Sequence, residues 1–443
     1  MGLLLTLSAI WLILSLIFSI EKKKPQFKLG MLVFVVLYYL AHFSIAIPII
    51  HNLSLAGAFR MGHYLFFLLL LGVYICFFIV NKNKIKENKI FLYMNQILVL
   101  YCVASTIWSY DANRTFISGI SLVILLNTTI AILSLLTLRQ NLKVLNFILL
   151  GIALTSYIAF IYGGNFYLDD GRFNSIFSHP NFFGPLMAFG LLLNYYYLFE
   201  KKTKIILYLS LVAYIHLLIL GHSATSIIIS VTVLAIMLIS KYLSVFLNNF
   251  EKRTVLLVFP AITFLIPLIF FVIISNVIPY TFELVERDFS LTGRVPFWSF
   301  LVNYSRSIHN WIFGYGYNGF FNPHSLESLS YSMVHRYGFP RAFTGQAHNG
   351  FIRVFIELGF IGLLLLVTVL ITTYMKIITL LFKEPNNDVF FLHALWWFIV
   401  LANMTEDRFF STNIFWVLFL VLCFYTQKLH STSKKKYIPF NTE

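Results

Sequence analysis

The sequence predicts an all-α fold, a polytopic transmembrane helical bundle of about 12–13 spans with a large extracytoplasmic loop that contains short interfacial helices. Composition and hydropathy both predict this class. Of the 443 residues, 59% are hydrophobic and only 11% are charged, which is too few charges to solvate a globule of this size. The apolar residues also gather in runs of about 20, the length that a helix needs to cross the hydrocarbon core of a bilayer.

The apolar runs form an N-terminal and a C-terminal series. The first series lies near 2–20, 29–50, 62–80, 90–108, 116–137 and 144–162. The second lies near 181–199, 204–220, 224–240, 255–278, 350–375, 389–403 and 410–427. The first run lacks a basic leader and a small-residue cleavage site, so we expect a retained span and not a signal peptide.

Two long polar stretches interrupt these runs and suggest four parts. The parts are N-terminal transmembrane helices at 1–162, transmembrane helices with a first outer motif loop at 163–278, a large extracytoplasmic loop at 279–347, and C-terminal transmembrane helices with a basic tail at 348–443. The first polar stretch opens the second part at 163–180, and the second stretch is the whole third part.

Lysine and arginine are segregated between alternate loops. All 20 lysines fall in one set of loops and in the C-terminal tail, together with Arg139 and Arg253. The positive-inside rule makes that set cytoplasmic, so both polar stretches face outward. The outer arginines are Arg60, Arg114, Arg172, Arg287, Arg294, Arg306, Arg336, Arg341 and Arg408. The net charge of +15 therefore reflects membrane topology, and we expect no nucleic-acid partner.

An outer face that carries cations only as arginine has two explanations. A guanidinium binds a carboxylate or a phosphate through two hydrogen bonds, which indicates an anionic ligand. Alternatively, these arginines pair with acidic residues of the same loops, among them Glu406 and Asp407. The sequence itself leaves both explanations open for any single arginine.

No metal and no cofactor are expected. The three cysteines lie in apolar runs, and no Cys or His pair has the spacing of a metal or redox motif. Asp169 and Asp170 are adjacent in a loop, so their carboxylates diverge and do not form a magnesium site.

The first outer stretch places Arg172 ahead of a predicted helix. Pro180 suits the first turn of that helix, and His179 and Asn181 flank it. Helix N-termini carry unsatisfied N–H groups that attract anions, so Arg172 and this terminus together predict a phosphate seat. The alternative is that His179 and Asn181 merely cap the helix.

The second outer stretch opens with Thr292-Gly293-Arg294 at the start of another predicted helix. Apolar side chains then recur at helical spacing, at Phe297, Leu301, Tyr304 and Ile308. We expect one interfacial segment, with Trp298 and Trp311 as belt aromatics. The glycines between 314 and 319 predict a tight turn that lets the backbone approach a neighbour closely, although glycines between aromatic residues also serve ordinary packing.

The same stretch closes on the sharpest constellation of the chain. Arg341, His348, Arg353 and Glu357 fall within one turn-and-helix unit at the outer membrane boundary. Arg353 and Glu357 are four residues apart and can pair on one helical face, and an ionisable pair inside a span usually marks a functional site. A histidine at the start of such a helix can act as a general base, because imidazole titrates near neutral pH. The alternative is a capping or interfacial histidine.

These motifs resemble the bacterial O-antigen ligase and polysaccharide polymerase superfamily of integral membrane glycosyltransferases. The resemblance rests on the segments GRFNSIFSHPN, HSATS, TGRVPFW and GYGYNGF. It rests above all on His348-Asn349, followed by nine residues and then Gly359-x-x-Gly362, which is similar to a signature of the family. We also expect Gly359 and Gly362 to permit close packing against a neighbouring helix.

The resemblance implies a metal-independent enzyme of the bacterial cytoplasmic membrane, with its active site on the extracytoplasmic face and its C-terminus in the cytoplasm. It implies that His348 activates the acceptor and that outer arginines bind the diphosphate of an undecaprenyl-diphosphate-linked oligosaccharide. The expected substrate-binding residues are Arg172, Asn181, Arg294, Arg341, Arg353 and Glu357. Membrane lipid, a flippase and a chain-length regulator are the implied partners.

One segment departs from the family pattern. Many relatives carry an arginine in the short serine-rich outer turn, where this sequence has Gly221-His222-Ser223-Ala224-Thr225-Ser226. His222 and the hydroxyls of Ser223 and Thr225 are candidates to replace its phosphate contact, unless the remaining arginines hold the ligand alone.

The Thr-Gly-Arg and Gly-Tyr-Gly-Tyr segments resemble those of exopolysaccharide polymerases, so the predicted function is polymerisation of lipid-linked repeat units into a capsular, exopolysaccharide or O-antigen chain. A ligase that transfers finished glycan to a lipid or protein acceptor is the nearest alternative. A transporter or lipid flippase is an alternative of another class. It is disfavoured because the charged residues cluster at the outer boundary and not near the middle of several spans.

Overall fold

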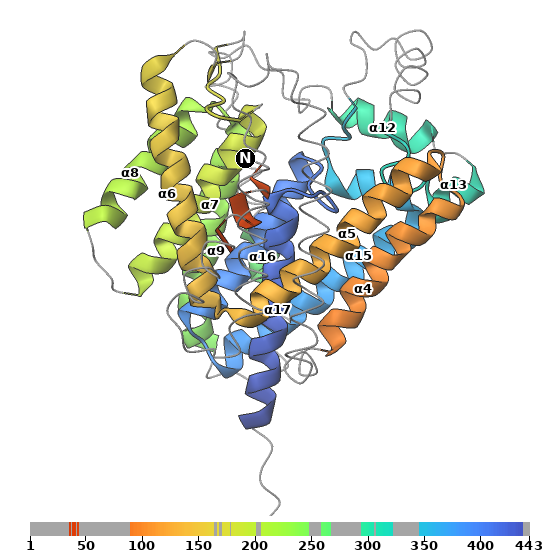
Figure 1. Ribbon diagram of the computed structural model, residues 1–443. Coiled ribbons are helices and arrows are strands. Elements are labelled where there is room, and N and C mark those ends of the chain that lie inside the picture. The colour runs from red at the N-terminus through yellow and green to blue at the C-terminus, as the bar shows by residue number, and fades with distance from the viewer. Residues whose placement is uncertain are drawn as a thin grey trace, which may run out of the picture.

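The chain forms a bundle of long helices (Figure 1). The computed structural model describes residues 35–36, 38–40, 42–43, 89–163, 166–167, 171–177, 179–200, 205–247, 258–266, 294–304, 307–321 and 345–436. Within these ranges the only β pairing is an isolated bridge between Tyr167 and Phe173, so the all-α class is confirmed. The predicted runs near 2–20 and 62–80, and most of those near 29–50 and 255–278, lie outside the described residues.

Seven of the described helices are long and apolar enough to cross a membrane. They are α5 (Ala112–Leu135), α6 (Leu138–Tyr162), α7 (Pro180–Phe199), α9 (Ala224–Leu247), α15 (Gly350–Lys383), α16 (Asn387–Thr405) and α17 (Ile414–Lys436). The shorter helices α4 (Lys89–Ala104) and α8 (Ile205–Leu220) are also apolar. Each of these helices covers one of the predicted runs, which makes the chain a multi-pass membrane protein.

Capping residues in the sequence explain where several helices begin. Asp111 accepts a hydrogen bond from the Arg114 N–H at the start of α5. Thr137 and Gln140 form a reciprocal capping box at the start of α6. Asn386 caps α16 by accepting from the Val389 N–H. The short loops that carry these caps make successive helices antiparallel.

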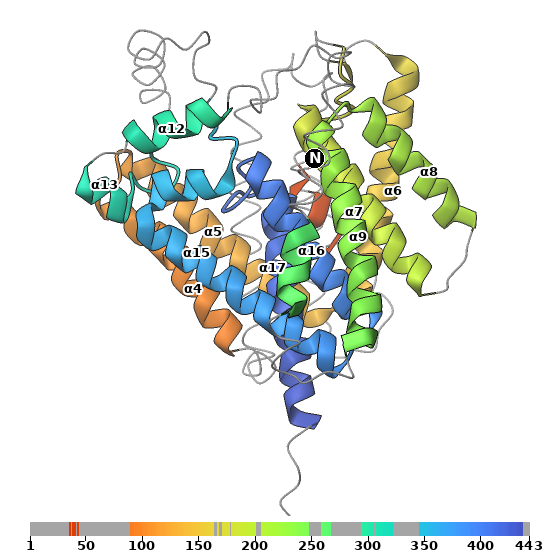
Figure 2. The ribbon, with the colours of Figure 1, turned by 180° about the vertical axis from the view of Figure 1, so that it is seen from behind.

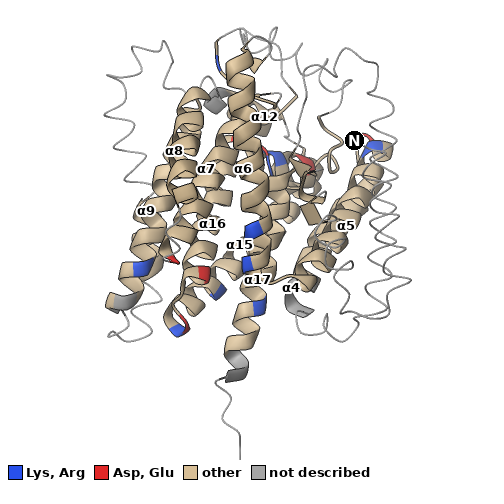
Figure 3. Ribbon diagram, turned by 60° about the vertical axis from the view of Figure 1, so that its left-hand side comes forward, with Lys and Arg blue, Asp and Glu red and all other residues tan. Residues whose placement is uncertain are grey.

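Charged residues of both signs lie near both ends of the bundle (Figure 3). Arg139, at the start of α6, lies 3.3 Å from Glu200 after α7 and 3.4 Å from Asp388 at the start of α16, so these three helix ends meet. Lys241 of α9 lies 4.4 Å over the Phe199 ring at the same end. We call this the lysine end and the opposite one, where α7 and α15 begin, the arginine end.

Two short helices cover part of the arginine end, as Figures 1 and 2 show from opposite sides. They are α12 (Arg294–Tyr304) and α13 (Ile308–Phe313), where the spacing of apolar residues predicted one continuous segment. Phe297 and Leu301 pack into a small apolar cluster under α12, whereas Ile308 is 80% exposed. Ser307 caps α13 as a new helix, so the segment is divided although its apolar spacing continues across the division.

A kink divides α15 at Gly359, where φ is 66° and ψ is −168°. Only glycine occupies this backbone region readily. The prediction that Gly359 and Gly362 together permit packing against a neighbouring helix is therefore wrong in part. A Cβ on Gly359 would lie 2.3 Å from the Ile312 carbonyl oxygen of α13, but one on Gly362 would meet Leu358 of its own helix at 2.2 Å.

The loop after α13 docks into this kink, which confirms that the glycines of 314–319 allow a close backbone approach. A Cβ on Gly314 would lie 2.4 Å from the Glu357 carbonyl oxygen. The Tyr315 N–H donates to the Ile356 carbonyl at 3.0 Å, and Trp108 donates to the Phe313 carbonyl at 3.0 Å. Gly314 thus approaches the first segment of α15, whereas Gly316 and Gly319 approach Ser109 before α5, and the glycines serve packing.

Gly359→Ala is expected to lower the free energy of unfolding by about 2 kcal/mol or more, because the methyl group meets backbone atoms and the dihedral angles become strained. Thermal unfolding of the detergent-solubilised protein measures this loss. Gly151→Ala is a matched control within α6, since a Cβ there meets nothing within 4 Å. Equal stability of the two variants would contradict the role assigned to the kink.

Candidate active site

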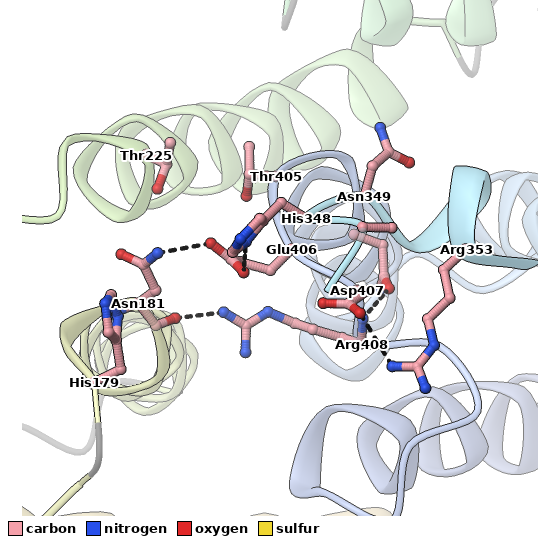
Figure 4. Close-up of polar contacts among 12 residues, drawn as sticks. His179, Asn181, Thr225, His348, Asn349, Arg353, Thr405, Glu406, Asp407 and Arg408 are labelled. Atoms are coloured by element: carbon pink, nitrogen blue, oxygen red, sulfur yellow. Dashed lines mark hydrogen bonds and ion pairs between the residues drawn. The ribbon is translucent and has the colours of Figure 1, made fainter. Parts of the chain in front are cut away.

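Polar side chains from three segments converge at the arginine end (Figure 4). One segment is the first turn of α7, which begins at Pro180. The second is the turn before α15, which contains His348 and Asn349. The third is the loop between α16 and α17, whose first residues are Glu406, Asp407 and Arg408.

Glu406 joins the other two segments through its two carboxylate oxygens. The Nδ1 atom of His348 lies 3.1 Å from Oε2, and the Nδ2 atom of Asn181 lies 2.7 Å from Oε1. An ionised carboxylate only accepts hydrogen bonds, so both nitrogens act as donors. When Nδ1 of a neutral imidazole carries the proton, Nε2 is its basic nitrogen. The arrangement therefore holds His348 in the form that a general base requires.

The backbone before α15 presents His348 as a side chain of the turn and not as a cap. His348 has a φ of 50°, in the left-handed region. The cap is Asn349, whose Oδ1 accepts from the N–H groups of Phe351 at 3.0 Å and Ile352 at 3.2 Å. The alternative that His348 caps this helix is therefore wrong. Trp298 of α12 donates to the Ala347 carbonyl at 2.8 Å, which ties the turn to the helix above it.

Arg353 is the centre of a second, largely buried network. Its Nε lies 3.2 Å from Glu357, so the pair predicted from the four-residue spacing is confirmed. A second guanidinium nitrogen lies 3.0 Å from Asp407, and the third donates to the Asn318 side chain at 3.3 Å. Arg353 thereby joins α15, the docked loop and the α16–α17 loop.

Arg408 is only 4% exposed. Its guanidinium donates to the Asn181 carbonyl and lies 4.0 Å from the centre of the Phe415 ring. Burial lowers the pKa of the Arg408 guanidinium to about 10, and Glu406 and Asp407 oppose that shift, so the group stays charged at neutral pH. No carboxylate of the described residues lies within ion-pair distance of it. The buried Arg408 side chain thus links the α16–α17 loop to α7.

The backbone N–H groups that were predicted to form a phosphate seat at the start of α7 already have acceptors in the protein. Asn181 N–H donates to the His179 Nδ1 atom at 3.1 Å, and the N–H groups of Phe182 and Phe183 donate to the His179 carbonyl. Pro180 has no N–H. His179 is therefore the helix cap, as the alternative to a phosphate seat predicted.

The other predicted binding residues are only partly placed. Arg172 is half-buried in the loop that precedes α7, and Arg294 is the first residue of α12. Arg341 lies outside the described residues. The structure therefore brings His348, Asn181, Arg353 and Glu357 together, and puts Arg172 and Arg294 on elements of the arginine end.

The serine-rich turn between α8 and α9 packs against α7. A Cβ on Gly184 would lie 2.6 Å from the Ser226 hydroxyl, and Ser223 lies 2.7 Å from Ser226. Ser223 is buried in this contact, whereas Thr225 is half-buried on the side that faces the site in Figure 4. Of the hydroxyls proposed to replace an arginine, Thr225 is the better placed.

Sequence reasoning missed the part that the α16–α17 loop has in the site. Glu406, Asp407 and Arg408 were noted only as outer charges, yet each holds a predicted site residue. Their signal was a run of three consecutive charged residues, two acidic and one basic, in a short loop between two apolar runs. Asn318 carried no comparable signal. Among the described residues, no three His, Cys, Asp or Glu side chains are grouped as metal ligands.

The fold and this constellation define a multi-pass membrane protein with a histidine–carboxylate pair at one end of its bundle. Residues 207–367 match the model of a family described as O-antigen ligase. The match supports the resemblance of this part of the chain to the O-antigen ligase and polysaccharide polymerase superfamily, and with it a membrane glycosyltransferase of that type. It includes His348 and ends before the α16–α17 loop. No curated protein matches the chain.

Proposed function

We propose that the protein polymerises lipid-linked oligosaccharide repeat units at the extracytoplasmic face of the bacterial cytoplasmic membrane. Glycan would pass from undecaprenyl diphosphate to a sugar hydroxyl of the acceptor. The observation that carries the proposal is the hydrogen bond from His348 Nδ1, inside the superfamily match, to Glu406, which follows the match in the chain. The arginine end is the extracytoplasmic one under the positive-inside rule.

His348 is the general base of this proposal. Its Nε2 atom takes the proton of the acceptor hydroxyl as the oxygen attacks the anomeric carbon, and the bond from that carbon to the diphosphate oxygen breaks. Glu406 keeps the imidazole oriented and stabilises the positive charge that forms on it. Positioned proton transfer of this kind typically contributes a factor of about 10² to 10⁴ to the rate.

In this proposal the diphosphate of the donor binds away from the carboxylates that surround Arg353 and His348. The described centre holds the carboxylates of Glu357, Glu406 and Asp407 beside two guanidinium groups. Three carboxylates beside two cations disfavour the binding of a polyanion at this centre. We therefore assign the departing diphosphate to Arg172, Arg294 and Arg341, whose guanidinium groups would stabilise its charge.

Arg353 and Glu357 have a supporting role in this proposal. All three guanidinium nitrogens of Arg353 already have acceptors in the protein. We therefore assign both residues to holding the site together, in place of the substrate contact predicted for them.

A ligase that transfers finished glycan remains the nearest alternative, because it would use the same donor and the same base. Lipid extracts from a strain that lacks the gene separate the two. Accumulation of single lipid-linked repeats supports the polymerase, and accumulation of long lipid-linked chains supports the ligase. A polymerase would also need a flippase to deliver its donor and a regulator to set chain length.

A transporter or flippase calls for ionisable residues along a path through the membrane. His393 of α16 is buried within the bundle, where it accepts a hydrogen bond from Trp397 at 3.3 Å and contacts the Ser240 hydroxyl at 2.7 Å. These contacts suit a neutral core histidine and disfavour transport. Accumulation of lipid-linked repeats only on the cytoplasmic side of the deletion strain would support transport instead.

A further inference from the structure

We infer that Asn181 is a positioning residue, which sets the orientation of Glu406 and thereby the proton position on His348, and that Pro185 and Arg408 hold Asn181 in place. The inference rests on the proposed general-base function of His348. It replaces the substrate contact that the sequence suggested for Asn181.

Pro185 provides the first step. In an α-helix the N–H of residue i+4 donates to the carbonyl of residue i. Pro185 lies within α7, four residues after Asn181, and has no N–H. The Asn181 carbonyl therefore lacks its helical donor, and Arg408 of the α16–α17 loop donates to it instead.

Asn181 is consequently held on three sides. Its carbonyl accepts from Arg408, and its N–H donates to His179 at 3.1 Å. Its side-chain amide donates to Glu406 Oε1 at 2.7 Å. The amide cannot turn without placing its oxygen against a carboxylate, so the orientation of the whole residue is fixed.

This fixed donor determines how Glu406 meets His348. With Oε1 occupied by Asn181, Oε2 faces Nδ1 of His348 at 3.1 Å. Both Glu406 oxygens accept, so Nδ1 must carry the proton and Nε2 must be basic. Asn181 thus acts on the reaction through Glu406 and has no need to contact the substrate.

An amide exchange tests the inference in the full-length protein, purified and reconstituted with undecaprenyl-diphosphate-linked oligosaccharide. Glu406→Gln alone should lower kcat by about 10³-fold, because the new amide offers its oxygen to Asn181 and its NH₂ to His348, which selects the wrong tautomer. Asn181→Asp alone should lower kcat by about 10²-fold, because it sets two carboxylates against each other.

The double variant Asn181→Asp/Glu406→Gln should be more active than Glu406→Gln by about tenfold or more. In it, the amide at position 406 donates to the carboxylate at position 181 and turns its oxygen back to His348. A double variant no more active than Glu406→Gln would overturn the inference. His348→Ala that keeps wild-type activity would instead overturn the proposed function itself.

Pro185→Ala gives an independent test that does not depend on a destabilised variant. Alanine restores an N–H that competes with Arg408 for the Asn181 carbonyl, and it favours the helix. We expect kcat to fall about tenfold with KM for the lipid-linked donor unchanged and thermal stability undiminished. Wild-type kcat in this variant would overturn the part assigned to Pro185 and Arg408.

Discussion

His348→Ala is expected to lower the rate of glycan extension by about 10³-fold or more, which removes long glycan from the cell. The expected loss is large because the variant removes the base and leaves the Glu406 carboxylate without the imidazole 3.1 Å away. Gel analysis of the surface polysaccharide, with immunoblotting for the protein in the membrane fraction, measures the effect.

His216→Ala is the matched control for this variant. His216 is an exposed histidine of α8 whose Nδ1 atom lies 3.0 Å from the Tyr157 hydroxyl, and neither residue contacts the polar groups of the site. The His216→Ala protein should be as abundant in the membrane as His348→Ala and should make glycan of wild-type length. Unchanged chain length in His348→Ala, at normal abundance, would remove His348 from the chemistry.

Arg353→Met is expected to lower the free energy of unfolding by about 3–5 kcal/mol, the second large effect. Methionine keeps much of the side-chain volume but leaves two carboxylates without their cation, and Glu357 and Asp407 are 3% and 5% exposed. Removing one partner of a buried ion pair is costly, because the remaining charge is uncompensated. Thermal unfolding of the purified protein in detergent measures the loss.

Two further variants show whether charge causes this loss. The triple variant Arg353→Met/Glu357→Gln/Asp407→Asn removes all three charges, and most of the stability should return. Arg114→Met, at the first turn of α5, should change stability little because its side chain is half-exposed. Equal destabilisation by the single and triple variants would mean that packing, and not charge, explains the effect of Arg353.

The helices and the nearest contacts of the site were predictable because their signals are local. Runs of about 20 apolar residues predict spans, and a four-residue spacing predicts the Arg353–Glu357 pair. His348 could be singled out from its place before a helix and from the family signature. Each of these inferences depends on residues that are close in the sequence.

The contacts that were missed join distant parts of the chain. Glu406 is 58 residues from His348, and Arg408 is 227 residues from Asn181. Nothing in a single sequence states that such pairs meet. The Gly359 kink was missed for another reason: a glycine that packs between helices and one that adopts a positive φ look alike in sequence.

The most direct test of the central proposal is an extension assay with the purified protein alone in proteoliposomes. Undecaprenyl-diphosphate-linked oligosaccharide is the sole substrate, and glycan length and released undecaprenyl diphosphate are measured together. We predict that the wild-type protein makes longer lipid-linked glycan, that one undecaprenyl diphosphate is released for each bond formed, and that His348→Ala does neither. Extension at the same rate by His348→Ala, or no extension by folded wild-type protein, would contradict the proposal.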